Sequence, residues 1–101
     1  MKEIKEVFFK HAQFKEKVEF KESCCEKVDF ENATFEKLAD FYRTKFYKVN
    51  FERADFKEIA VFSETEFYCD VNFKYTKFFG KSIFRDVVIT GGTESKRFYF
   101  Q

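Results

Sequence analysis

The fold of this chain is decided by residues 48–62, which read KVNFERADFKEIAVF. Phe51, Phe56 and Phe62 follow one another at intervals of five and six residues, and each stands two positions after a valine or an alanine. An α-helix turns about 100° per residue, so steps of five would spread these rings around its whole circumference. In a flat strand, steps of five would put successive rings on opposite faces. The chain must therefore turn between one phenylalanine and the next, so that all the rings point to a common axis.

The same spacing runs through most of the chain, which is the signature of a repeat architecture. A small or β-branched residue stands two positions before each repeat centre from Val7 to Val87, and 14 of the 18 phenylalanines are centres. The centres are Ile4, Phe9, Phe14, Phe20, Cys25, Phe30, Phe35, Phe41, Phe46, Phe51, Phe56, Phe62, Phe67, Phe73, Phe78, Phe84 and Ile89. The pattern predicts a coil of short straight segments joined by tight corners.

The six-residue steps give the number of sides. They begin at Phe14, Phe35, Phe56 and Phe78, which are 21, 21 and 22 residues apart, and the last interval contains a further six-residue step after Phe67. A four-sided coil of 21 residues places the additional residue at the same corner in every turn. The centres then form four columns: side one (Phe9, Phe30, Phe51, Phe73), side two (Phe14, Phe35, Phe56, Phe78), side three (Phe20, Phe41, Phe62, Phe84) and side four (Ile4, Cys25, Phe46, Phe67, Ile89).

Outward positions of the expected coils support this register through their charges. The residue pairs after the side-two centres, KE, EK and KE at residues 15–16, 36–37 and 57–58, alternate in sign from coil to coil. Glu22, Arg43 and Glu64 do the same after side three. Like charges directly opposite each other on neighbouring strands are destabilising, so alternation is expected where coils stack.

This layout resembles the pentapeptide-repeat family, whose motif of a small residue, a polar residue, Leu or Phe and two further residues is matched by VNFER, ADFKE, VDFEN, ATFEK and TEFYC. The resemblance covers about residues 2 to 90. It implies an all-β fold, a right-handed quadrilateral parallel β-helix (a solenoid) of about four coils. The chain departs from the commoner pattern in having Phe at the centres and a regular six-residue corner, which we interpret as a bulge-like relaxation that makes room for the larger rings.

A separate C-terminal tail is expected at residues 91–101, because the motif fails after Ile89 and the sequence becomes ITGGTESKRFYFQ. Gly91 and Gly92 are interpreted as a turn. Phe98, Tyr99 and Phe100 either fold back to cover the last coil as a cap or also pack against a second copy in a homodimer. The resemblance favours the dimer, since several family members dimerise end to end through C-terminal apolar residues. A third interpretation is that the chain is a fragment of a longer protein.

Composition and charge exclude several classes of protein. The 19 basic and 18 acidic residues leave a net charge of +1, so the basic excess typical of a nucleic-acid binder is absent. No run approaches the roughly 18 apolar residues of a membrane span, and the start MKEIKEVFF lacks the apolar region of a secretory signal. Three cysteines, two of them adjacent, indicate reduced thiols. A cytoplasmic protein of one domain is expected.

No set of residues predicts catalysis, a cofactor or a metal site. His11, the only histidine, falls at an exposed corner, and Cys25 occupies a core centre where a buried, inert thiol is expected. Cys24 and Cys69 are more exposed by register but lack the spacing of metal ligands. Gly80 reads as a corner residue rather than part of a phosphate-binding loop. The chain is therefore predicted not to be an enzyme.

The surface feature that indicates a function is aromatic. Tyr47 and Tyr68 fall in one outward column of side four, and Tyr42, Tyr75 and Phe79 are also expected outside. Such rings either mark a partner site or form cross-strand pairs that stabilise the ladder.

The function predicted from these features is a non-enzymatic scaffold or protein–protein interaction module of unknown partner. The alternative, implied by resemblance to the gyrase-protecting branch of the family, is a DNA-mimicking regulator of a type II topoisomerase. A balanced charge and a rod of only about 20 Å count against this alternative.

Overall fold

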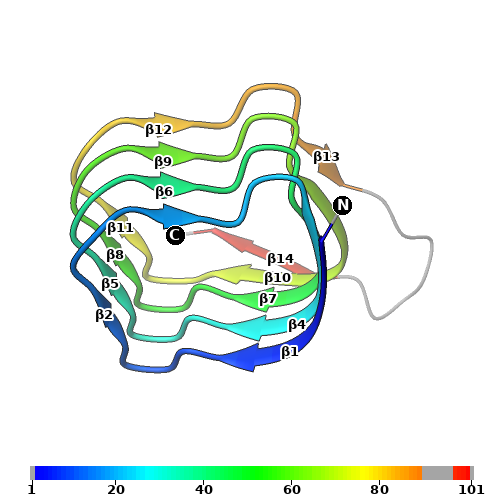
Figure 1. Cartoon of the computed structure of the whole chain (residues 1–101), viewed down its shortest axis with the longest axis horizontal. Helices are drawn as coiled ribbons and strands as arrows, with labels where there is room; N and C mark the ends of the chain where they lie inside the picture. The colour runs from blue at the N-terminus through cyan, green and yellow to red at the C-terminus, as the bar shows by residue number, and fades with distance from the viewer. Residues whose placement is uncertain (1, 90–96, 101) are drawn as a thin grey trace.

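The computed structural model describes residues 2–89 and 97–100, and these residues form a parallel β-solenoid of about four coils (Figure 1). The described residues contain strands and turns but no helix, so the predicted all-β solenoid is confirmed. The strands are β1 (Lys2–Phe8), β2 (Gln13–Phe14), β3 (Val18–Glu19), β4 (Ser23–Asp29), β5 (Thr34–Phe35), β6 (Ala39–Asp40), β7 (Lys45–Asn50), β8 (Asp55–Phe56), β9 (Ala60–Val61), β10 (Glu66–Phe73), β11 (Lys77–Phe78), β12 (Ser82–Ile83), β13 (Val88–Ile89) and β14 (Arg97–Phe100).

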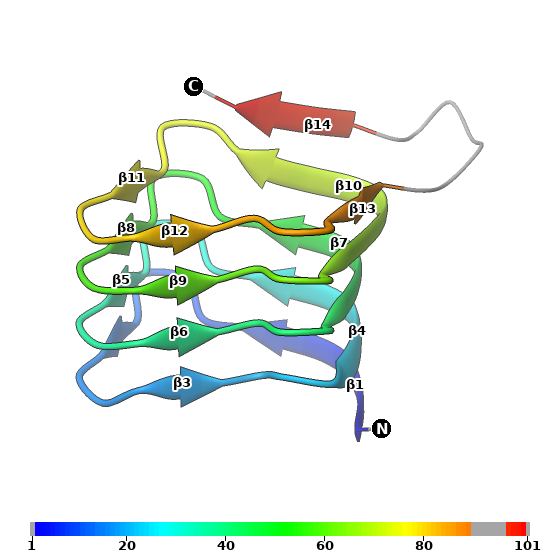
Figure 2. The same cartoon turned by 90° about the horizontal axis from the view of Figure 1, so that it is seen from above.

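These strands stack into three parallel sheets rather than four (Figure 2). Side two is the sheet β2-β5-β8-β11 and side three is the sheet β3-β6-β9-β12. Sides four and one share the sheet β1-β4-β7-β10-β13, because each long strand bends from one side into the next without a break. The centres pair as the sequence register requires: Cys25 with Phe46, and Phe35 with Phe56.

Tight turns close two of the four corners. In each complete turn the third residue is left-handed, with φ between 54° and 65°, and the N–H of the fourth residue donates to the carbonyl of the first, as Ala33 does to Phe30 at 3.0 Å. This is the geometry of a type II turn. None of the left-handed residues is a glycine; they are His11, Asn32, Arg53 and Tyr75 after side one, and Glu22, Arg43, Glu64 and Asp86 after side three.

The turn peptides also bond from coil to coil, which holds these strained residues in place. The N–H of His11 donates to the Glu31 carbonyl at 2.8 Å, and that of Asn32 to the Glu52 carbonyl at 2.9 Å. A left-handed residue with a side chain costs on the order of 1 kcal/mol. The stacked backbone bonds offset this cost in the first three coils, each of which has a coil above it.

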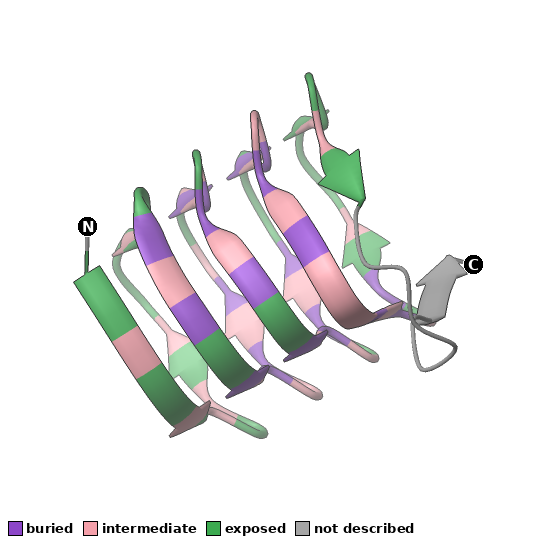
Figure 3. Cartoon of the chain, turned by 90° about the vertical axis from the view of Figure 1, so that its right-hand side faces the viewer, coloured by how far each residue is buried: buried purple, intermediate pink, exposed green. Residues whose placement is uncertain are grey.

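The core is a lattice of phenylalanine rings, most deeply buried in the two middle coils, whereas the coils at both ends are more exposed (Figure 3). Within a column the rings lie face to face: Phe35 and Phe56 have centroids 4.6 Å apart and planes 2° apart. Between columns they meet edge to face, as Phe41 and Phe51 do at 5.5 Å and 75°. Stacked and T-shaped arrangements are the two favourable aromatic geometries. The predicted ring columns are therefore confirmed.

Buried threonines complete the interior. Thr44 and Thr65 stand at the small position of side four, and their hydroxyls donate to the carbonyls of Phe20 and Phe41 in the coil before, at 2.8 and 2.7 Å. Thr76 on side two does the same to the Phe51 carbonyl at 2.7 Å. A buried hydroxyl is tolerated only when it is hydrogen-bonded, which explains why these residues occur in the core.

Both irregular spacings in the sequence correspond to local irregularities. The regular six-residue step leaves a three-residue bend between β2 and β3 and at the equivalent corners above. The further step after Phe67 is a register shift between Phe67 and Asp70, where β10 carries one more residue than β7. A β-bulge accommodates such an insertion without disturbing the ladder on either side.

The backbone of β14 continues side one by one further level. It pairs in parallel with β10, with Val71 opposite Phe98 and Phe73 opposite Phe100. In Figures 1 and 2, β14 lies beside β10 at the C-terminal end of the stack. Residues 90–96, including the expected Gly91-Gly92 turn, lie outside the described residues, as do the side chains of Phe98, Tyr99 and Phe100. Their assignment to a cap or a dimer contact therefore stays a prediction.

Candidate interaction surface

The histidine and the core cysteine that were considered for chemistry lie at different places in the fold. His11 is an exposed turn residue, and Cys25 is fully buried among the core rings. Burial raises the pKa of the Cys25 thiol to about 11, with a smaller effect from neighbouring Cys24. Such a thiol is a poor nucleophile at neutral pH, because the thiolate is the reactive form. Within residues 2–89 and 97–100 no group of His, Cys, Asp and Glu side chains is arranged to hold a metal ion, and no helix is long and apolar enough to cross a membrane.

Tyr47 and Tyr68 do come together, on the outside of side four. Their ring centroids are 5.0 Å apart and their planes differ by 23°, so the rings stack between consecutive coils. Tyr47 is 39% exposed and Tyr68 is half-buried. The Tyr68 hydroxyl donates a hydrogen bond to the Glu66 carboxylate on the same strand. The pair therefore presents a fixed aromatic surface with one anchored hydroxyl.

That hydrogen bond controls the titration of Tyr68. It favours the protonated phenol and, together with partial burial and the charge of Glu66, raises the pKa of Tyr68 to about 12. The folded pKa lies above the ordinary value of about 10, so the associated stability is present below that pH and is lost as the pH rises towards 12. We expect Glu66→Gln to lower the Tyr68 pKa by about one unit or more, as followed by phenolate absorbance in an alkaline titration. Glu64→Gln is the matched control, and an unchanged titration in Glu66→Gln would contradict the assignment.

The other three predicted surface aromatics do not join this pair. Tyr42, Tyr75 and Phe79 lie at three different corners of the solenoid. Each is paired with a cation instead: Arg43 lies 5.2 Å from the Tyr42 ring, Arg53 lies 5.0 Å from the Tyr75 ring, and Lys57 lies 4.5 Å from the Phe79 ring. The exposed rings of Tyr75 (46%) and Phe79 (60%) are thus partly covered by their own chain. The five predicted residues form one stacked pair and three separate contacts.

Sequence reasoning missed an apolar strip on the outside of side three. Leu38, Ile59, Val61 and Ile83 occupy outward positions on successive coils, and Ile59 is 42% exposed. The signal was present in the sequence as a change along two outward columns. These columns begin with the charged residues Lys17 and Glu19 in the first coil and become apolar in later coils. The strip has only a few side chains, and isolated exposed apolar residues are common on soluble proteins.

The predicted charge alternation is confirmed at two corners. Lys37 lies 3.7 Å from Glu58, and Arg43 lies 3.1 Å from Glu64, each pair joining consecutive coils. Both pairs are about half exposed, so solvent screens them and each adds little to the stability of the fold. Side one does not follow this rule, since Lys27 stands directly beside Lys48 in the next strand.

Comparison with known proteins identifies the repeat independently. A family model for pentapeptide repeats, in nine copies, matches residues 9–55 and 51–94. Searches of curated proteins and of solved structures each returned no match. The repeat spacing, the stacked parallel coils and the family match over most of the chain agree, and the chain belongs to the pentapeptide-repeat family.

Proposed function

We propose that this protein is a non-enzymatic scaffold that binds a protein partner through its outer surface. The interior of the described coils is filled by rings, the single histidine lies at an exposed turn, and Cys25 is buried among the core rings. A stack of paired coils is a rigid support, because each level is bonded to its neighbours along all sides. The three cysteines are free, which is consistent with a reducing, cytoplasmic setting.

The observation that carries the proposal is the stacked pair Tyr47 and Tyr68. Tyrosine is enriched at protein interfaces because it combines a large apolar ring with a hydrogen-bonding group and loses little conformational entropy. In this pair the orientation of Tyr68 is already fixed by Glu66, so a partner would pay little to order it.

The test is affinity capture from a native lysate with wild-type protein and with a Tyr47→Ser/Tyr68→Ser variant. We expect a partner that is retained by the wild type and lost with the variant. Tyr42→Ser/Tyr75→Ser is the matched control, because it removes two tyrosines at separate corners. Retention of every partner by the Tyr47/Tyr68 variant, with its circular dichroism unchanged, would exclude this surface.

A homodimer through one end of the solenoid is proposed as a further partner contact. At the C-terminal end Val88 and Ile89 are 41% and 43% exposed, and β11 and β12 are the last described strands of their sheets. Exposed apolar residues beside unpaired strand edges favour association. The contacts of Phe98, Tyr99 and Phe100 belong to the same proposal.

Topoisomerase regulation by DNA mimicry is not favoured by the described surface. The stacked outward residues Lys10, Glu31, Glu52 and Lys74 mix both signs, whereas a duplex mimic needs a continuous acidic face.

A further inference from the structure

We propose that side one is a self-complementary face through which two copies of this chain pair side by side. The face consists of three outward columns that run parallel to the solenoid axis. The central column contains Phe8, Asp29, Asn50 and Asn72, which are register partners on successive strands. One flanking column stands two residues before it and the other two residues after it.

The two flanking columns carry opposite charges at each level of the four coils, whereas the further level formed by β14, which sets Arg97 in register with Asp70, is not part of this pattern. The pairs are Glu6 and Lys10 in the first coil, Lys27 and Glu31 in the second, Lys48 and Glu52 in the third, and Asp70 and Lys74 in the fourth. Register and turn hydrogen bonds place each column in line from coil to coil. The first column therefore reads minus, plus, plus, minus, and the second reads plus, minus, minus, plus.

A two-fold axis along the central column matches the signs of these four coils. A copy turned by 180° about an axis parallel to its solenoid axis keeps each coil at the same height and exchanges the two flanking columns. Lys27 then faces the Glu31 position of the other copy, and the same holds at the other three levels. This is an isologous contact, in which the same patch is used by both copies.

The charge order also fixes the register of the pairing. If one copy slides by one coil, Glu6 meets the Glu31 position and Lys48 meets the Lys74 position, so two levels become repulsive. Like-charge contacts across an interface are a common means of excluding wrong arrangements.

Within a single copy, like charges are neighbours in the middle of each flanking column. Lys27 and Lys48 are adjacent in register, and Glu31 and Glu52 follow each other in the next column. Like charges opposite each other in a ladder are destabilising. The outer levels carry the opposite sign, with Glu6 the register partner of Lys27 and Asp70 that of Lys48, but no carboxylate of a described residue lies within ion-pair distance of either lysine. A partner copy adds a counter-charge at the level of both lysines.

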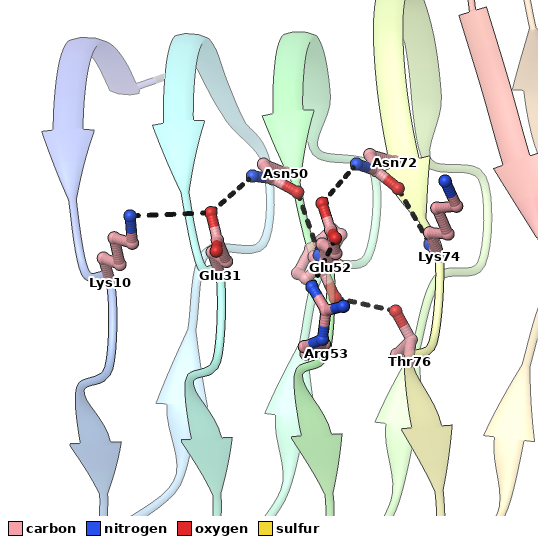
Figure 4. Close-up of polar contacts among 9 residues, drawn as sticks. Lys10, Glu31, Asn50, Glu52, Arg53, Asn72, Lys74 and Thr76 are labelled. Carbon is pink, nitrogen blue, oxygen red and sulfur yellow. Dashed lines mark hydrogen bonds and ion pairs between the residues drawn. The ribbon is translucent and has the colours of Figure 1, made fainter.

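Polar contacts hold the acidic residues of this face in position (Figure 4). The amide of Asn50 donates to the Glu31 carboxylate at 3.5 Å, and that of Asn72 to Glu52 at 3.2 Å, so both carboxylates are drawn over the central column. Lys10 lies 3.8 Å from Glu31, and Arg53 pairs with the other oxygen of Glu52 at 2.6 Å. The acidic groups are therefore partly ordered before a second copy arrives.

One exposed ring lies on the same face. Phe8, 60% exposed in the first coil, stands in the central column and would meet its own counterpart on the axis. Within its own chain the ring is contacted by Lys27, whose ammonium lies 5.9 Å from the ring centroid. A shallow hollow lies along this face and is lined by Lys48, Asn50 and Asp70 among others.

The size of the face sets the strength of the pairing. Four coils span about 19 Å and five extended residues about 13 Å, which gives a patch of roughly 250 Å² on each copy. This is below the ~600 Å² per partner of a small standard interface. The pairing is therefore a weak, concentration-dependent one, and its charge pairs make it sensitive to salt.

The test is sedimentation equilibrium of the full chain with charge-reversed variants. For the wild type we expect the dissociation constant to rise by about tenfold or more between low salt and 0.5 M salt, because screening weakens exposed charge pairs. In an Ile89→Asp background, which removes the end-to-end contact, Glu31→Lys/Glu52→Lys and Lys27→Glu/Lys48→Glu should each be monomeric. Their equimolar mixture should regain the association of the Ile89→Asp protein. Lys15→Glu/Lys57→Glu on another corner is the matched control and should behave as wild type. A mixture that stays monomeric, or single variants that dimerise, would overturn the proposal.

A cross-linking arm keeps the test independent of the folding of those variants. In a Cys24→Ser/Cys69→Ser background, Phe8→Cys should form a disulfide-linked dimer under mild oxidation, whereas Gln13→Cys, on side two, should not. Equal cross-linking at both positions would place the contact elsewhere.

Ile89→Asp separates this pairing from the end-to-end dimer. The side-one dimer should survive the substitution, and loss of all association in Ile89→Asp would refute the side-one interface.

Discussion

Phe51→Ala is expected to lower the free energy of unfolding by about 3–5 kcal/mol, the largest effect of any single substitution considered. Phe51 has no exposed surface and lies between Phe30 and Phe73, whose ring centroids are 5.1 and 5.0 Å away with nearly parallel planes. It also makes edge-to-face contacts with the rings of Phe41 and Phe62 at 5.5 and 5.7 Å. Alanine would remove the apolar contact and leave a cavity that the bonded coils cannot close.

The loss approaches the whole stability of a small domain, which is about 5–15 kcal/mol, so a large part of the variant should be unfolded at 37 °C. Urea unfolding followed by far-ultraviolet circular dichroism measures the effect. Phe9→Ala is the matched control in the same column, because Phe9 belongs to the first coil and is only half-buried. We expect a clearly smaller loss there. Equal losses at the two positions would show that burial in the middle coils does not dominate stability.

Gly80→Ala is expected to destabilise the protein by about 1–3 kcal/mol, although the residue is exposed. A Cβ at Gly80 would lie 2.6 Å from the carbonyl oxygen of Glu58, 2.7 Å from its carbonyl carbon and 2.9 Å from its Cα. These are backbone atoms of the coil below, so the clash is relieved only by moving the ladder between β8 and β11 or between β9 and β12.

The matched control for Gly80→Ala is Glu16→Ala, at the equivalent corner of the first coil, where a Cβ is already present. Its unfolding free energy should change by less than about 0.5 kcal/mol. The midpoint of urea unfolding separates the two variants. A Gly80→Ala midpoint equal to that of the wild type would mean that the last complete coil is loosely held at this corner.

The sequence alone determined the number of sides, the column of every centre and the places where the spacing is irregular. Steps of five and six between Phe51, Phe56 and Phe62 are incompatible with a helix or a flat strand, and the repeat of 21 residues left one register. The stacking of Tyr47 on Tyr68 followed from the same register. These features were predictable because each coil repeats the same short-range pattern, so one correct period places all the others.

Other features depend on contacts between coils, which no local pattern encodes. The sequence did not distinguish a turn from a bend, so the merging of sides four and one into a single sheet came only from the tertiary structure. The partners of Thr44 and Thr65 are carbonyls 24 residues away, and the reason for Gly80 is the backbone of Glu58. Side-chain direction at the corners decides which charges share a face, and this is set by left-handed residues such as Asn32 and Arg53. The repeat period determines how the coils stack, whereas the directions in which the corners turn determine which side chains share an outer surface.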